Sequence, residues 1–266
     1  MTLTVVEFTD PFCPWAWGSE PTFRRLRHML GADERPAVEW RRVFGMLFDI
    51  SDEPAPDPVA ETAWYHHHLH EIAQHTGAPV PAVLERVAAT SRPASLAAKA
   101  AEIQGPAIAE RVLRRLREQL FLTGKPPDTP RRVRQTISNI AGLDVARLEA
   151  DMVSDAVVEA LARDYAETFA PVPELADVGG ADNQAVSSRA VGSRAVGAGG
   201  PHPGGAKEID GRLRYAFPTL LITGPAGRRV VPGWRPLAEY VDAIRAAAPD
   251  QRLGDVDVDG DVDARG

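Results

Sequence analysis

The sequence predicts an α/β fold whose two halves are separated by a large helical insertion, and three observations predict it. An apolar run at 3–8, a helical run and a second apolar run give a β-α-β start. From 58 to about 169 the apolar spacing is almost all helical and is interrupted by glycines. Between 214 and 248 the chain closes with two strands and a helix.

The first half of the α/β domain is expected over residues 1–57. Its first strand is rich in β-branched residues. Ser19 and Pro21 form a helix start signal, because proline is well suited to the first helical turn. We expect this helix to end at Leu30 and a second strand to cover 36–44.

Residues 58–175 are expected to form the inserted helical domain. Its helices are placed at 58–76, 79–88, 93–104, 106–122, 129–140 and 144–168. The arginines between 111 and 117 alternate with leucines at helical spacing. We therefore expect a solvent-facing helix surface there rather than a nucleic-acid patch.

The second half of the α/β domain is expected over residues 207–250. Residues 176–206 are low in sequence complexity, which is typical of a flexible loop. The expected elements are a strand at 215–222, a hairpin partner at 228–231 and a helix at 236–248, followed by a disordered acidic tail at 251–266.

Composition limits the classes of function. Hydrophobic residues make up 44% and charged residues 25%, as in globular proteins. No apolar run approaches the roughly 18 residues of a membrane span, and the first residues lack the basic start of a signal peptide. The net charge of −7 argues against nucleic-acid binding. A lone cysteine excludes an internal disulfide, so we expect a cytoplasmic protein. From the hydropathy and the charge we expect no membrane or nucleic-acid partner.

Two patterns suggest metal binding but are incomplete. His66 and His70 lie at i, i+4 on one expected helix, yet no third ligand follows the zinc pattern. The tail at 255–261 matches the first half of a calcium-binding loop but lacks the closing glutamate. We expect no metal site.

The chemistry-bearing motif surrounds Cys13, the only cysteine, between the first strand and the first helix. Helix N-termini favour the thiolate, so this position predicts a lowered pKa and a nucleophilic sulfur. Pro14 would stiffen the turn and Trp15 would shield the sulfur. Asp10 and Glu20 could exchange protons with the thiol, or serve as a helix cap or remain solvated. A buried, inert cysteine is the alternative.

The chain resembles the cytoplasmic DsbA-family proteins of thioredoxin fold, in particular the FrnE-like dithiol-disulfide isomerases. The resembling segments are 10–15, 18–21, 91–94, 99–105, 114–118, 142–144 and 217–220. The resemblance implies a thioredoxin-like fold with an inserted helical domain, Cys13 as the attacking thiol, and a cis Pro218 that shapes the substrate groove. The substrate-binding positions that it implies are Phe12, Pro14, Trp15, Ala16, Phe217 and Thr219.

Ala16 departs from the family pattern, because the resolving cysteine of a C-x-x-C pair would stand there. Cys13 alone can form a mixed disulfide with a protein or small-molecule disulfide but cannot release it. An external low-molecular-weight thiol, glutathione or mycothiol, would then act as co-substrate, with no bound cofactor. Two alternatives remain. One is a non-catalytic DsbA-like adaptor. The other is a thiol-cofactor enzyme like the kappa-type glutathione transferases and hydroxychromene-carboxylate isomerases, whose motif is serine-based.

Overall fold

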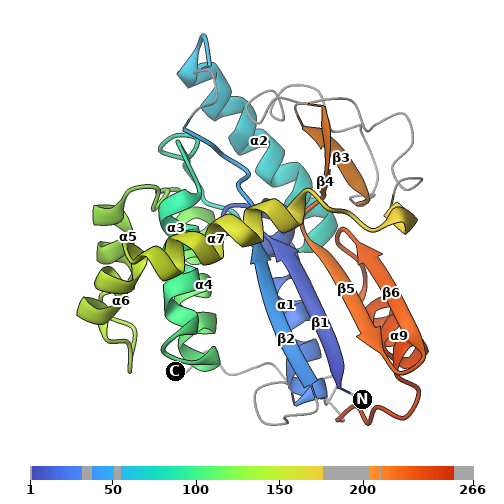
Figure 1. The fold of residues 1–266 in the computed structure, drawn as a ribbon. Coiled ribbons are helices and arrows are strands. Elements are labelled where there is room, and N and C mark those ends of the chain that lie inside the picture. The colour runs from blue at the N-terminus through green and yellow to red at the C-terminus, as the bar shows by residue number, and fades with distance from the viewer. Residues whose placement is uncertain (1, 32–37, 51–54, 176–203, 210, 255–266) are drawn as a thin grey trace.

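A four-stranded sheet combines two strands from the first part of the sequence with two strands from its last part (Figure 1). The computed structural model describes residues 2–31, 38–50, 55–175, 204–209 and 211–254. Along the sheet the order is β2 (Val38–Phe44), β1 (Leu3–Thr9), β5 (Thr219–Gly224) and β6 (Gly227–Pro232). β1 is parallel to β2 and antiparallel to β5, and β5 is antiparallel to β6. The predicted β-α-β start and β-β-α end are therefore confirmed.

Two helices pack together beside this sheet: α1 (Pro14–Leu30) and α9 (Leu237–Ala247). Phe23 of α1 meets Tyr240 of α9 edge to face, with 5.2 Å between ring centroids. The expected start of α1 near Ser19 was wrong, because Pro14 already occupies its first turn, where no N–H is needed. The helix consequently begins immediately after Cys13.

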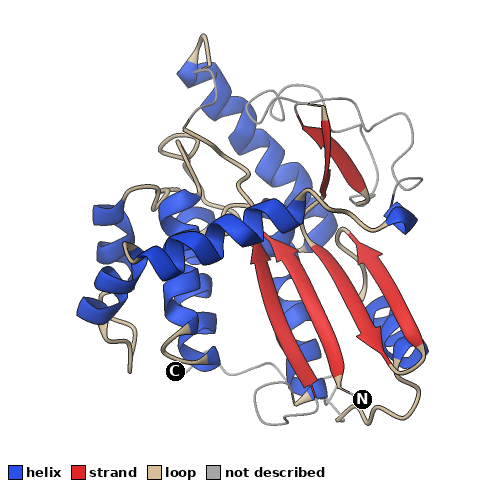
Figure 2. Ribbon diagram, viewed as in Figure 1, coloured by secondary structure: helices blue, strands red, loops and turns tan. Residues whose placement is uncertain are grey.

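The insertion contains six of the helices in the described part of the chain (Figure 2). They are α2 (Pro58–Thr76), α3 (Arg92–Glu102), α4 (Pro106–Phe121), α5 (Pro130–Ile137), α6 (Val145–Met152) and α7 (Asp155–Thr168). The helix expected at 79–88 was wrong: this segment is not helical, and its backbone bonds to distant groups instead, with the Glu85 N–H donating to the Gly124 carbonyl at 2.9 Å. The helix expected at 144–168 is two helices, because Ser154 caps α7 by accepting a hydrogen bond from the Val157 N–H at 3.4 Å.

Helix α7 crosses the sheet at the carboxyl end of β2 (Figure 1). The Phe44 N–H donates to Asp164 of α7 at 3.2 Å, and Lys99 of α3 forms an ion pair with the same carboxylate at 2.9 Å. The insertion is thus tied to the sheet by buried polar contacts as well as by apolar packing.

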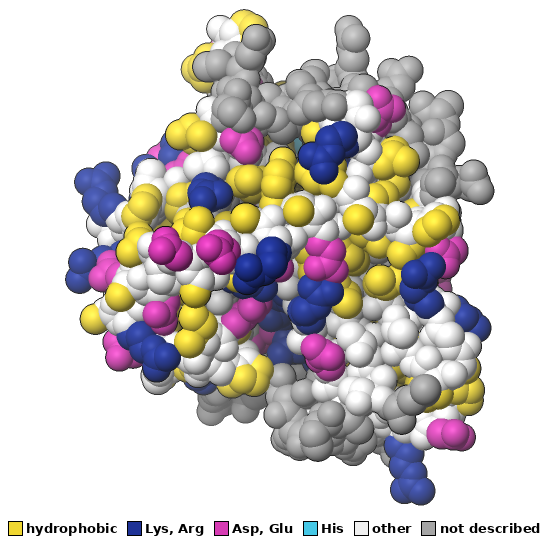
Figure 3. Space-filling view, in the orientation of Figure 1, with side chains coloured by type: hydrophobic (Ala, Val, Ile, Leu, Met, Phe, Trp, Pro, Cys, Tyr) yellow, Lys and Arg dark blue, Asp and Glu magenta, His cyan; other side chains and the backbone are white. Residues whose placement is uncertain are grey.

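We expected the basic run of α4 to face solvent, but part of it is buried. Arg117 is 2% exposed and donates to Thr9 Oγ1 at 2.8 Å. Arg114 and Arg115 remain exposed and pair with Glu118. On the face drawn in Figure 3, basic and acidic side chains are interspersed rather than gathered by sign.

Of the strand expected at 215–222, residues 219–222 belong to β5, but the strand is interrupted at Pro218. Tyr215 instead ends β4 (Arg212–Tyr215), which pairs with β3 (Ala206–Ile209) in a separate hairpin. A short 3₁₀ turn, η1 (Pro173–Leu175), precedes it. The expected loop at 176–206 and the acidic tail lie largely outside the described residues. None of the described helices is long and apolar enough to cross a membrane.

Candidate active site

Cys13 occupies the N-cap of α1, directly after the loop that follows β1. Its N–H donates to the Asp10 carbonyl at 3.2 Å, and its own carbonyl accepts the first helical hydrogen bond from the Trp17 N–H at 3.0 Å. The backbone is extended there, with φ −76° and ψ 118°, as is usual for an N-cap. The sulfur therefore lies at the amino end of the helix.

The Phe217–Pro218 peptide bond is cis, as expected, and lies against Cys13. The Cys13 Sγ–H donates to the Phe217 carbonyl at 3.4 Å across 204 residues of sequence. The Pro218 carbonyl accepts from the Gly233 N–H at 2.8 Å, which anchors this loop to the end of β6. The structure thus brings together Cys13 and Pro218, the two residues predicted to be catalytic.

All eight residues predicted for the site are buried. Cys13 is 4% exposed and Trp15 is 8% exposed, the latter stacked on His75 with 6.0 Å between ring centroids. Phe12 is fully buried in the apolar cluster that extends into the helical insertion. Thr219 is also fully buried and donates to the Ala216 carbonyl at 2.7 Å. Ala16, in the position of a second cysteine, is 1% exposed.

The pKa of the Cys13 thiol is opposite in direction to the sequence prediction. Its pKa is raised from 9.0 to about 11, mainly by burial and to a smaller extent by the nearby Asp10 carboxyl. The backbone N–H groups of Ala16 and Trp15 lower the pKa, as expected at a helix N-terminus, but they do not compensate for the loss of water. At neutral pH the resting thiol is therefore protonated.

Asp10 is a buried anchor for three chain segments. Its carboxylate accepts hydrogen bonds from the Phe12 N–H at 2.7 Å, the Leu47 N–H at 2.8 Å and the Ser91 hydroxyl at 2.7 Å. It therefore holds the Cys13 loop against the chain after β2 and the start of α3. Glu20 is 4% exposed and lies 3.6 Å from Arg24, so neither acid is simply solvated.

A buried charge cluster beneath the site was not predicted from the sequence. Glu7 of β1 is 1% exposed and pairs with Arg42 at 3.1 Å and with Arg117 at 3.8 Å. Burial opposes ionisation of Glu7, but these guanidinium groups outweigh it and hold its pKa below the usual value. The signal was available, since Glu7 is an acid within an otherwise apolar strand.

The histidines of α2 do not form a metal site. Among the described residues no group of three His, Cys, Asp or Glu side chains could hold a metal ion. His66 lies 2.8 Å from the Pro81 carbonyl, and His68 lies 3.1 Å from a Glu71 oxygen. The calcium-like pattern at 255–261 lies outside the described residues.

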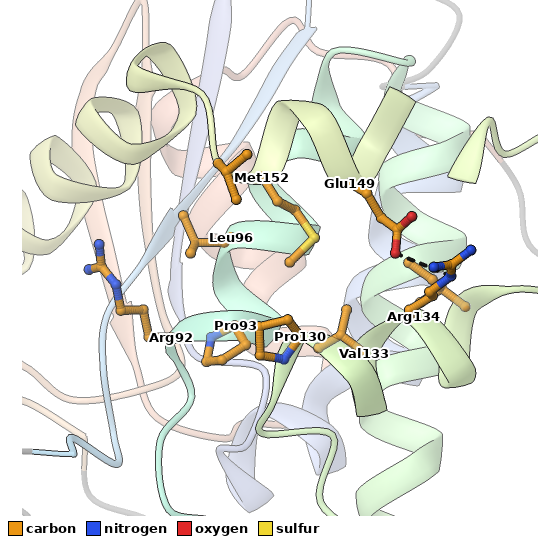
Figure 4. Close-up of a pocket in the computed structure, with 10 residues that line it drawn as sticks. Arg92, Pro93, Leu96, Pro130, Val133, Arg134, Glu149 and Met152 are labelled. Carbon is orange, nitrogen blue, oxygen red and sulfur yellow. Dashed lines mark ion pairs between the residues drawn. The ribbon is translucent and has the colours of Figure 1, made fainter. Parts of the chain in front are cut away.

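A cavity of about 330 Å³ lies within the helical insertion, between α3, α5 and α6 (Figure 4). Leu96, Val133 and Met152 form part of its apolar wall. Arg134 and Glu149 form an ion pair at 3.2 Å at its edge. None of its lining residues contributes to the apolar cluster around Cys13.

A family model described as Thioredoxin matches residues 7–169, which is more than half of the chain and includes both Cys13 and most of the helical insertion. The chain belongs to the thioredoxin family. Two solved structures have the same fold as this thioredoxin-family chain, although their sequence identity is low. A Nitrosomonas europaea protein proposed to be a protein disulfide isomerase has a TM-score of 0.61 and 14% identity, covering 92% of this chain and 95% of that one.

The second structure is the cytosolic disulfide reductase DsbM from Pseudomonas aeruginosa, which was also solved with GSH. It has a TM-score of 0.53 and 16% identity, covering 94% of this chain and 95% of that one. A curated relative, the ClpXP adapter protein SpxH of Halalkalibacterium halodurans, is 30% identical over 62% of this chain and 54% of its own length. The thioredoxin-family chain therefore spans about half the length of this relative.

Proposed function

We propose that this protein is a DsbA-type thiol-disulfide oxidoreductase that acts by monothiol exchange, with Cys13 as its sole nucleophile. The observation that carries this proposal is the contact between Cys13 Sγ and the Phe217 carbonyl at the cis-Pro218 loop. A sulfur at a helix N-terminus, opposite a backbone that can align an incoming disulfide, is arranged for exchange.

The exchange proceeds in two steps. The Cys13 sulfur attacks one sulfur of a substrate mixed disulfide, a new S–S bond forms, and the substrate leaves as a thiol that carries the proton Cys13 has lost. A second, small thiol then attacks the Cys13 disulfide, leaves as the oxidised small-molecule disulfide, and its proton returns to Cys13. Because Ala16 provides no internal thiol, both electrons for the reduction come from the small thiol.

The burial of Cys13 determines when the first step can occur. With a pKa of about 11, roughly one molecule in ten thousand carries the thiolate at pH 7. The free protein should therefore react slowly with general electrophiles. We propose that a bound substrate displaces the side chains that cover the sulfur and that the exchange follows.

A second candidate function is that of a non-catalytic adaptor, which binds one protein and presents it to another. The raised pKa of Cys13 favours this candidate, because it describes a poor resting nucleophile. The curated relative named as a ClpXP adapter supports it as well.

The test compares three proteins on a peptide that carries a glutathione mixed disulfide, with reduced glutathione as the resolving thiol. Wild type should release oxidised glutathione catalytically, and Cys13→Ser should be inactive. Ala16→Cys should form an internal disulfide and no longer depend on the small thiol for release. If wild type and Cys13→Ser release the same amount of oxidised glutathione, the exchange proposal is wrong and the adaptor function remains.

A further inference from the structure

Lys207 is the side chain near Cys13 that the proposed mechanism does not use. It lies on β3 directly opposite Arg214 of β4, so both cations lie on one face of the hairpin. Like charges in directly opposed positions destabilise a strand pair. Lys207 is partly buried, and its ammonium group makes no hydrogen bond or ion pair with any described residue. A partly desolvated cation without a partner among the described residues is suited to binding an anion.

The hairpin face that carries Lys207 is adjacent to the wall of the Cys13 site. The guanidinium of Arg214 lies 4.7 Å from the centre of the Phe217 ring and donates to the Met46 carbonyl at 2.9 Å. Phe217 is the residue whose carbonyl accepts from the Cys13 thiol. Ala206, which precedes Lys207 on β3, packs in the same apolar cluster as Cys13 and Phe217, so the hairpin lies beside the sulfur. Burial and the charge of Arg214 lower the pKa of Lys207.

Helix α2 completes the surroundings of Lys207. Ile72 of this helix packs in the same apolar cluster as Ala206 and Tyr215 of the hairpin, so helix and hairpin lie side by side. Burial lowers the pKa of His68 on the same helix. Tyr65, one turn earlier, is 8% exposed, and its hydroxyl has no hydrogen-bond partner. Tyr65 packs in the same apolar cluster as Phe12, the residue before Cys13, and burial raises the pKa of this unpaired donor.

Resting on the proposed function, we propose that the co-substrate is an anionic, carboxylate-bearing low-molecular-weight thiol, whose carboxylate contacts the Lys207 ammonium while Tyr65 donates a hydrogen bond to it. The two unsatisfied groups match the two chemical features of such a thiol, a negative charge and polar acceptor atoms. Glutathione has this chemistry. A neutral sugar thiol such as mycothiol carries no carboxylate and would leave Lys207 unpaired.

The first experiment measures the dependence of turnover on the thiol. Wild type should use glutathione about tenfold more efficiently than its diethyl ester, in which both carboxylates are neutralised. Lys207→Gln should remove this preference by lowering the rate with glutathione and leaving the rate with the ester unchanged. Lys125→Gln, which makes the same charge change at an exposed lysine, should retain the preference. Equal losses for both thiols in Lys207→Gln would overturn the inference.

A second experiment does not require turnover. S-methylglutathione, which keeps both carboxylates but cannot react, should bind Cys13→Ser in a calorimetric titration, and about tenfold more weakly when Lys207→Gln or Tyr65→Phe is added. Binding without turnover in wild type would refute the exchange function and support the anion site. Turnover without Lys207-dependent binding would overturn the anion site and leave the exchange function standing.

Discussion

The pH dependence of Cys13 reactivity follows from its burial and is the most direct test of the site geometry. The thiol is 4% exposed, and its pKa is about 11 instead of 9.0. That difference makes the thiolate population about 100-fold smaller at neutral pH. It corresponds to about 3 kcal/mol by which the folded protein favours the thiol over the thiolate. The rate of iodoacetamide alkylation of the folded protein should therefore keep rising beyond pH 9 and reach half its maximum near pH 11.

The raised pKa of Cys13 also makes the stability of the folded protein fall as the pH rises. Because the pKa is raised by folding, the native state holds the thiol proton between pH 9 and about 11, where the unfolded chain has lost it. The contribution is complete below pH 9 and is lost as pH rises towards 11. Over that window wild type should lose about 3 kcal/mol of unfolding free energy relative to Cys13→Ala, which keeps all the tyrosines and lysines.

Two observations would refute this reasoning. The first is half-maximal alkylation of the folded protein below pH 9, equal to that of the same chain unfolded in guanidinium chloride. The second is parallel stability curves for wild type and Cys13→Ala between pH 9 and 11. Either result would mean that water reaches the sulfur in the folded protein.

Three further substitutions test the contacts that hold the site. Arg117→Met should lower the free energy of unfolding in urea by about 1–3 kcal/mol, because Glu7 keeps Arg42 but loses its second guanidinium partner and Thr9 loses its donor; unchanged stability would contradict these buried contacts. Gly45→Ala should lower it by about 1–3 kcal/mol, because the added methyl group would overlap the Phe217 ring, and unchanged stability would contradict that contact. Asp57→Ala should lower it by about 1 kcal/mol through loss of the α2 cap, measured by thermal unfolding, with no change in Cys13 alkylation.

The fold could be predicted because its signals are local. Alternating apolar runs and helical spacing identify strands and helices without knowledge of their neighbours. One of the failures also has a local cause. Ser19 and Pro21 form a valid helix start signal, but Pro14 is an equally good first-turn residue and lies nearer to the strand. At 79–88 the apolar spacing favours a helix, but the Glu85 N–H donates to the distant Gly124 carbonyl, a contact that local spacing cannot show.

The site could be predicted only in part, because its electrostatics depend on contacts that are distant in the sequence. The position of Cys13 before a helix was visible in the sequence and indicated a lowered pKa. The burial that reverses this effect comes from side chains contributed by α2, η1 and the β3–β4 hairpin. Arg117 was assigned to a solvent-facing surface because helical spacing alone cannot show which arginine of a basic run reaches a buried acid.

Burial of a single thiol links the two candidate functions. A protonated sulfur that is 4% exposed resists general oxidants, since oxidation requires a thiolate and access. Any partner that engages Cys13 must first displace the side chains that cover it, whether or not a disulfide then forms. Recognition of the partner therefore precedes chemistry in both cases. The Cys13→Ser variant separates them, because it retains the covered surface and loses only the bond.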